Sequence, residues 1–340
     1  MSENNPTFLP VRQDWLDRRH EPALEADLPI VDPHHHLWER PGWRYLLPEL
    51  LADLDTGHNI VATVFVQCRA MHRADGPEAM RPVGETEFVN GVAAMSASGG
   101  YGPTRVCEGI VGTADLRLGE AVSEVLEAHI RVAGGRFRGI RHIVAWDADS
   151  SVVNPGNPTT PGLLSDGAFR RGFARLAPLG LTFEAWLYHS QIDELARLAA
   201  VFPETRIVLN HVGGPLGRGG YSRDGVFEGW ARSIKGLAAC PNVFVKLGGL
   251  GMKINGFDFH ERAEPPSSED LATAWRPYVE TCIEAFGASR CMFESNFPVD
   301  KGSYSYGVFW NACKLMVRGV AATDRTALFS GTAKDFYRLQ

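Results

Sequence analysis

The stretch VDPHHHLW, residues 31–38, places three consecutive histidines at the end of a short apolar segment. Alternate side chains of a β-strand point to the same face, so we expect His34 and His36 on one side and His35 on the other. Two imidazoles on one face can bind a divalent cation or polarise a substrate group. The stretch therefore predicts a first strand that ends in a functional site, provided that other strands bring partners to it.

Eight apolar runs along the chain have the composition of strands that are buried on both faces. They span residues 29–36, 60–68, 107–116, 137–146, 181–188, 206–213, 242–249 and 290–298. Helical patterns follow several of them, at residues 120–132, 166–176, 191–201 and 268–286. This alternation predicts an α/β fold with parallel strands, a (β/α)₈ TIM barrel. An open doubly wound sheet is the alternative, but no glycine-rich phosphate-binding motif follows the first strand.

Four turn-rich segments follow strands and are too irregular to be simple connections. They span residues 70–84, 153–165, 215–225 and 248–268. In a barrel, segments that follow strands lie at the carboxyl-terminal rim, where active-site loops are found. We therefore expect an N-terminal extension over residues 1–27 and a single-domain barrel with long loops over residues 28–340.

The composition restricts the class of partner. The chain has 340 residues and a formal net charge of −6, which argues against nucleic acid or an anionic membrane as a partner. The first residues contain no basic start followed by an apolar run, and no stretch reaches the roughly 18 apolar residues of a membrane span. Six scattered cysteines form no C-x-x-C pair and are expected as reduced thiols. These features predict a cytoplasmic protein that acts on a small molecule.

Polar residues stand where the predicted strands end, and a packed core alone would not need them. They are His34 and His36, Arg138 and Arg141, Glu184, Trp186, Tyr188 and His189, His211, Lys246, and Glu294 and Asn296. The carboxyl ends of barrel strands converge, so these side chains are expected to meet. A lone strand-end histidine is more often structural, but four of them favour a function. The arginines suit either salt bridges at the rim or anion binding, and Lys246 suits either a buried ion pair or catalysis.

Four motifs occur in order along the chain: DPHHHLW (32–38), RGIR (138–141), NHVGGP (210–215) and FESNFP (293–298). Together they resemble the amidohydrolase superfamily. The similarity is to the amidohydrolase-related (amidohydrolase 2) branch of metal-dependent TIM-barrel hydrolases, which includes sugar lactonases and 2-pyrone-4,6-dicarboxylate lactonase. This resemblance implies a hydrolase, and dimers are frequent in the branch, so it also suggests a homodimer.

The resemblance also implies roles for the histidines. His34 and His36 correspond to the strand-one pair of the superfamily, His189 to the strand-five histidine and His211 to the strand-six histidine. We expect a divalent metal, zinc in the first place, on His34, His36 and His189, because three protein ligands plus water form a catalytic zinc site. His211 is expected to stabilise the oxyanion. The residues expected to bind the substrate are Arg138, Arg141, Trp186 and Tyr188.

The strand-eight motif departs from the family pattern, because Asn296 stands where the branch has an aspartate and Glu294 where it usually has glycine. An amide does not accept a proton at neutral pH and is a weak ligand for a hard cation. A metal could lower the pKa of water enough to reduce the need for a base, or Glu294, Asp300 or Glu184 could supply the carboxylate. Loss of hydrolysis is the third option. Glu294 shares a strand face with Asn296, so we expect Glu294 as the base and Asn296 as a residue that orients water or substrate.

The sequence therefore predicts hydrolysis of a small ester-like substrate, in the first place a lactone that is anionic or polyhydroxylated, by water activated at the barrel mouth. Metal-free hydrolysis is an alternative to the zinc mechanism. A metal-dependent non-hydrolytic decarboxylase on the same residues is a second alternative, and a catalytically inactive binding barrel is a third. Four strand-end histidines argue against the inactive barrel, because a binding protein has no physical need for them.

Overall fold

The computed structural model describes residues 8–154, 156–157 and 159–340. Residues 1–7 of the expected N-terminal extension lie outside the described residues, as do Pro155 and Pro158 of the turn-rich segment 153–165. In the described part of the extension, the short helix α1 (Gln13–Leu16) packs on the rest of the chain. The Trp15 indole N–H donates to the carbonyl oxygen of Arg262 at 3.1 Å, which fixes this segment against a distant loop.

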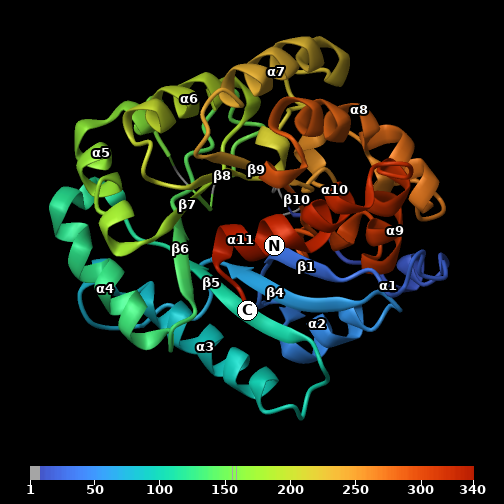
Figure 1. Cartoon of the computed structure of the whole chain (residues 1–340), viewed down its shortest axis with the longest axis horizontal. Helices are drawn as coiled ribbons and strands as arrows, with labels where there is room; N and C mark the ends of the chain where they lie inside the picture. The colour runs from blue at the N-terminus through green and yellow to red at the C-terminus, as the bar shows by residue number, and fades with distance from the viewer. Residues whose placement is uncertain (1–7, 155, 158) are drawn as a thin grey trace.

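Eight strands form one sheet in chain order, and each hydrogen-bonded pair of neighbours is parallel. They are β1 (Ile30–His35), β4 (Ile60–Val66), β5 (Arg105–Gly112), β6 (Phe137–Arg141), β7 (Thr182–Ala185), β8 (Ile207–Leu209), β9 (Val243–Leu247) and β10 (Cys291–Phe293). The segment after β10 returns to β1: the Asn296 N–H donates to the His34 carbonyl at 2.9 Å, and the His36 N–H donates to the Phe297 carbonyl at 2.8 Å. The sheet thus closes into the predicted (β/α)₈ barrel (Figure 1).

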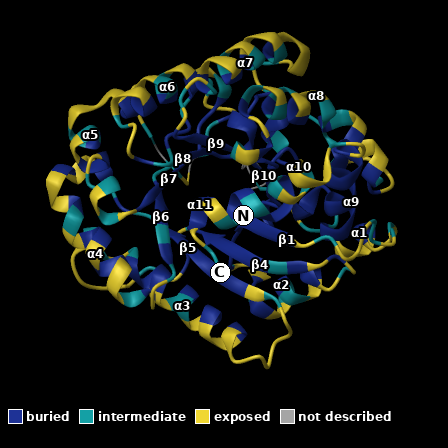
Figure 2. Ribbon diagram, in the orientation of Figure 1, coloured by how far each residue is buried: buried dark blue, intermediate teal, exposed yellow. Residues whose placement is uncertain are grey.

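Helices surround the barrel, and their exposed faces point outward while the strands are buried (Figure 2). They are α2 (Leu47–Leu54), α3 (Val83–Ala97), α4 (Val122–Val132), α5 (Gly167–Phe173), α6 (Ile192–Val201), α7 (Arg223–Leu237), α8 (Ser268–Phe286), α9 (Tyr306–Met316) and α10 (Ala322–Thr326). The four predicted helices correspond to α4, α5, α6 and α8. Helix α3 was not predicted, because its buried face includes the polar residues Glu85 and Thr86 and so lacks a clear apolar stripe. The hairpin of β2 (Trp38–Arg40) and β3 (Trp43–Tyr45) was also missed.

The interior of the barrel holds a separate apolar cluster, to which Val64, Val208 and Phe244 contribute. Helix α11 (Thr332–Tyr337) adds Phe336 and Tyr337 to the same cluster. In Figure 1 this helix lies across the middle of the ring of strands. The Arg206 guanidinium, one residue before β8, donates to the Asp335 carbonyl at 3.0 Å. Helix α11 therefore closes the amino end of the barrel and leaves the carboxyl end for the site.

Two expectations from composition can be compared with the structure. All six cysteines are free, as expected from their spacing. Among the described residues, no helix combines the length and the apolar character that crossing a membrane requires.

Candidate functional site

Three histidine rings lie together at the carboxyl ends of the strands. The His34 ring centroid is 5.0 Å from that of His36 and 4.6 Å from that of His211, and all three residues are buried. His34 belongs to β1, and His211 begins the short 3₁₀ turn η6 (His211–Gly213), separated by one residue from the end of β8. His35 points the other way, with its Nε2 2.8 Å from the Thr63 hydroxyl. The alternation inferred from the sequence therefore holds, and it brings the first and sixth barrel strands to one point.

The carboxylate of Glu294 bridges two of these rings. One of its oxygens lies 2.6 Å from His34 Nδ1, and the other lies 2.7 Å from His211 Nδ1. The second oxygen also accepts the backbone N–H of His211 at 3.0 Å. Burial raises the pKa of Glu294 to about 8, although the nearby Lys246 ammonium opposes the shift. Burial also lowers the pKa of both imidazoles, so two neutral rings flank a Glu294 side chain that keeps a proton more readily than an ordinary glutamate.

Two buried cations complete the cluster. The Arg141 guanidinium places Nη1 3.2 Å from His34 Nε2, and its Nη2 donates to the Gln67 carbonyl. The Lys246 ammonium lies 3.3 Å from His34 Nδ1 and donates to a carboxylate oxygen of Glu184 at 2.8 Å. Burial lowers the pKa of Arg141, but a guanidinium stays protonated in proteins. When Glu294 is ionised, the formal charges of Glu184 and Glu294 balance those of Arg141 and Lys246.

Asn296 has a different partner from the one expected. Its amide N–H donates to a carboxylate oxygen of Asp300 at 2.9 Å. The other oxygen of Asp300 accepts the Tyr304 hydroxyl at 2.5 Å and the Gly251 N–H at 3.0 Å. Burial raises the pKa of Asp300 to about 7. Of the carboxylates named from the sequence, Glu294 is thus the one with direct contacts to the histidines, while Asp300 is occupied by Asn296.

His36 lies beside His34, whereas His189 lies in a different loop with its own contacts. His36 Nδ1 lies 2.7 Å from the Val66 carbonyl, and its ring stacks on Trp38 at 5.7 Å between centroids. His189 lies four residues beyond β7, in the 3₁₀ turn η5 (His189–Gln191). Its Nδ1 accepts the Leu216 N–H at 3.4 Å, and its ring packs against Tyr221. The zinc set inferred from the resemblance is therefore spread over two locations in this structure.

The residues expected to bind substrate are also divided. Arg138 lies at the amino-terminal part of β6, where its Nη1 donates to the Gly135 carbonyl at 2.6 Å, and its neighbours include Arg338. The structure thus places Arg138 at the end of the barrel that α11 closes, away from Arg141. Trp186 packs against the His211 ring at 4.7 Å between centroids. The Tyr188 hydroxyl donates to the Val152 carbonyl at 2.6 Å, so it supports the wall beside Trp186.

Three residues at the site have left-handed backbone conformations, which residues other than glycine rarely adopt. His211, Val212 and Asn296 have φ values of 53°, 47° and 56°. Left-handed conformations of such residues persist where the surrounding structure enforces them, and they are frequent at functional sites. Gly249 approaches from the loop after β9 with a φ of 68°, and a Cβ there would overlap the Nδ1 atom of His211. A glycine at position 249 therefore allows the His211 ring to reach Glu294.

Gly249→Ala is expected to displace the His211 ring and to lower turnover at least tenfold, because the methyl group would overlap Nδ1. Gly180→Ala is the matched control, since Gly180 also has a positive φ, of 65°, in the left-handed region, but no atom lies within 4 Å of the place that its methyl group would take. Both variants should lose about 1–2 kcal/mol of stability from the left-handed backbone. Equal turnover in the two variants, measured with the same substrate, would contradict the steric argument.

The donor atoms of His34, His211 and Glu294 all lie within 4.8 Å of one another and are buried. Imidazole nitrogens with one carboxylate oxygen are a common donor set for zinc, so these residues fit a divalent cation. Neither His36 nor His189 belongs to this group. A second group, Asp258, His260 and Glu261, is more exposed, and its two carboxylates already bind Arg218. The chemistry therefore points to the first group.

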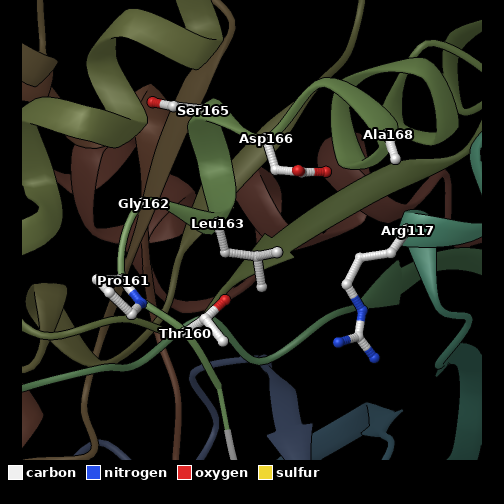
Figure 3. A pocket seen from close by; sticks show the side chains of 8 residues that line it. All are labelled: Arg117, Thr160, Pro161, Gly162, Leu163, Ser165, Asp166 and Ala168. Carbon is white, nitrogen blue, oxygen red and sulfur yellow. The ribbon is translucent and has the colours of Figure 1, made fainter.

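A shallow pocket of about 390 Å³ lies at the loop after β6, apart from the histidine cluster. Its lining residues are Arg117, Thr160, Pro161, Gly162, Leu163, Ser165, Asp166 and Ala168 (Figure 3). The Arg117 guanidinium is engaged by Asp115 at 2.8 Å, and Asp166 caps the first turn of α5. The polar groups of this pocket thus serve local structure.

Sequence patterns indicate only part of the buried polar network around Lys246. Lys246 and Glu184 were both noted at strand ends, but their mutual ion pair was not predicted. The sequence gives no indication of Tyr337, whose hydroxyl donates to Glu184 inside the barrel. No strand-end signal could have identified it, because it enters from the closing helix at the opposite end.

Comparison with known proteins agrees with this geometry. The sequence profile of the amidohydrolase family matches residues 31–339. The uncharacterized protein y4mH of Sinorhizobium fredii is 35% identical, and the alignment covers 92% of this chain and 100% of that protein. The L-fucono-1,5-lactonase of Burkholderia multivorans is 24% identical over 91% of this chain and 96% of its own length. A solved Burkholderia multivorans amidohydrolase with bound zinc is 26% identical, with a TM-score of 0.71, and covers 92% of this chain and 99% of its own.

Proposed function

The chain belongs to the amidohydrolase family, and we propose that this hydrolase opens a small lactone that carries an anionic or polyhydroxylated group. The observation that carries the proposal is the Glu294 carboxylate held between His34 and His211, with Arg141 beside them. Similarity to an L-fucono-1,5-lactonase supports a lactone as substrate, and the bound zinc of a related amidohydrolase supports a divalent metal.

His34, His211 and Glu294 are the residues that would hold the divalent cation, with zinc as the first candidate. When bound, the cation lowers the pKa of a coordinated water and polarises the carbonyl of the substrate. When Glu294 is ionised the protein charges around this position balance, so a bound cation leaves a positive excess. That excess, together with the Arg141 guanidinium, favours an anionic substrate group.

Glu294 is the proposed proton acceptor of the reaction. Its two oxygens face different histidines, so one of them can take up a proton while the other remains available to the cation. Water attacks the lactone carbonyl carbon, and one of its protons passes to a Glu294 oxygen. The ring C–O bond then breaks, and the same proton is returned to the departing ring oxygen. The product is an open-chain hydroxy acid.

The remaining side chains position the substrate. His36 keeps its Nδ1 on the Val66 carbonyl, and no described residue occupies its Nε2, which is therefore available for a substrate hydroxyl. Trp186 offers an apolar face beside His211 against which a sugar or pyrone ring can pack. Asn296 acts through Asp300, because its amide N–H is committed to that carboxylate.

The test is a panel of sugar-derived lactones and lactones of dicarboxylic acids, assayed with protein purified without chelators. Ring opening releases an acid, so a pH indicator follows turnover directly, and elemental analysis reports the metal. We expect turnover of at least one lactone with near-stoichiometric metal, loss of turnover after chelation, and recovery with added zinc. Release of carbon dioxide from a carboxylate substrate would instead identify a decarboxylase. Chelator-insensitive turnover by metal-free protein would overturn the metal assignment.

A further inference from the structure

A chain of buried polar contacts runs through the barrel from α11 to the candidate site. It starts at the Tyr337 hydroxyl, which donates to one carboxylate oxygen of Glu184 in β7. Tyr337 is the final residue of α11, so the contact joins the helix that closes the amino end to a strand of the barrel. Both side chains are fully buried. The hydroxyl thus ties the closing helix to a charged group inside the barrel.

The other oxygen of Glu184 leads toward the site by two branches. It accepts the Lys246 ammonium at 2.8 Å and the side-chain N–H of Asn210 at 2.5 Å. Lys246 also donates to the Pro33 carbonyl at 2.8 Å and lies 3.3 Å from His34 Nδ1. Asn210 directly precedes His211 in the chain. Glu184 is therefore linked to both histidines that flank Glu294.

We propose that Tyr337 is a positioning residue for the candidate site, acting through Glu184 on Lys246 and Asn210. A buried carboxylate needs donors on both oxygens, since an unpaired oxygen in a dry interior is strongly disfavoured. Removing the hydroxyl leaves one oxygen of Glu184 without its donor and allows the carboxylate to reorient. Lys246 and Asn210 then lose their fixed acceptor, and the ammonium beside His34 shifts. The consequence for turnover rests on the proposed function, but the coupling from Tyr337 to the His34 ring does not.

The experiment compares Tyr337→Phe with Phe336→Leu in the full-length protein. Phe336 is the neighbouring buried residue of α11 and packs on Phe244 and on the Tyr337 ring, so its substitution disturbs the packing of the same helix while keeping every hydrogen bond of the polar chain. The first readout is the imidazole nitrogen spectrum of metal-free protein labelled with ¹⁵N-histidine, in which His34→Gln identifies the His34 signals. The second is zinc affinity, measured by competition with a chromophoric chelator.

We expect Tyr337→Phe to shift the His34 ring signals and to weaken zinc binding, with the loss of about 10–100-fold that follows removal of a direct partner of a metal ligand as the upper limit. Phe336→Leu should lower the thermal midpoint at least as much while leaving both readouts unchanged. Unchanged His34 signals in a folded Tyr337→Phe protein would overturn the proposal, as would equal shifts in the two variants.

Two further outcomes are distinguishable. If Tyr337→Phe does not fold, Glu184→Gln tests the same link, and it should shift the His34 signals because the acceptor of Lys246 loses its charge. If the wild-type protein neither binds zinc nor opens a lactone, the proposed function fails, while the His34 signals of the metal-free variants still decide the coupling.

Discussion

Replacing Glu294 with glutamine is expected to lower lactone turnover by about 10²–10⁴-fold, the range typical of a lost general base. Glutamine keeps the size and polarity of the side chain but cannot accept a proton. Its NH₂ group would also face an imidazole Nδ1 that now contacts a carboxylate oxygen at 2.6–2.7 Å. Initial rates at low and saturating substrate, with metal content measured on the same samples, check this result. The metal analysis separates loss of the base from loss of the cation.

Asn296→Ala is the matched comparison for Glu294→Gln, because both residues follow β10 and both are buried. The Asn296 amide contacts Asp300, so its removal should reduce turnover less than the loss of Glu294. If Glu294→Gln retains nearly full turnover while Asn296→Ala abolishes it, the base has been assigned to the wrong residue. A metal-activated water that needs no protein carboxylate would then be the better account.

Lys246→Met is expected to destabilise the protein by about 3–5 kcal/mol, because it leaves the buried Glu184 carboxylate without its cation. Such a loss is a large part of the roughly 5–15 kcal/mol that stabilises a typical domain. Urea unfolding followed by circular dichroism measures the change. Lys235→Met on the exposed side of α7 is the control and should stay within about 0.5 kcal/mol of the wild type.

A double variant tests the cause of that loss. Adding Glu184→Gln to Lys246→Met removes the uncompensated charge while keeping an oxygen that can accept the Tyr337 hydroxyl. The double variant should therefore be more stable than Lys246→Met alone, with a favourable interaction energy between the two substitutions. Additive losses would show that packing of the lysine side chain, and not charge pairing, determines its contribution.

The eight strands could be predicted because strands buried on both faces give continuous apolar runs, and each of the eight predicted runs overlaps one strand of the barrel. Their ends could not be predicted equally well. The sixth run was expected over residues 206–213, whereas β8 ends at Leu209. The reason is that His211 and Val212 adopt left-handed conformations, which an apolar composition does not indicate.

The candidate site was predictable where it depends on alternation and on the convergence of parallel strand ends. Those two rules brought His34, His211 and Glu294 together. They do not reach His189, which follows β7 by four residues, because a turn has already changed the direction of the chain. Arg138 and Arg141 are three residues apart in a five-residue strand, so one lies near the amino end and the other near the carboxyl end. The family resemblance suggested both arginines as substrate-binding residues and did not indicate that they lie at opposite ends of the strand.

The position of α11 also bears on the order in which the barrel is completed during synthesis. Tyr337 and Glu184 are 153 residues apart in the chain, and all eight strands are translated before this helix is. Nascent domains fold from the N-terminus, and contacts between distant segments form slowly. The eight strands can therefore pair while the amino end of the barrel is still open to water. Only after residues 332–337 have left the ribosome can the closing helix dock, expel that water and give the interior its final hydrogen bonds.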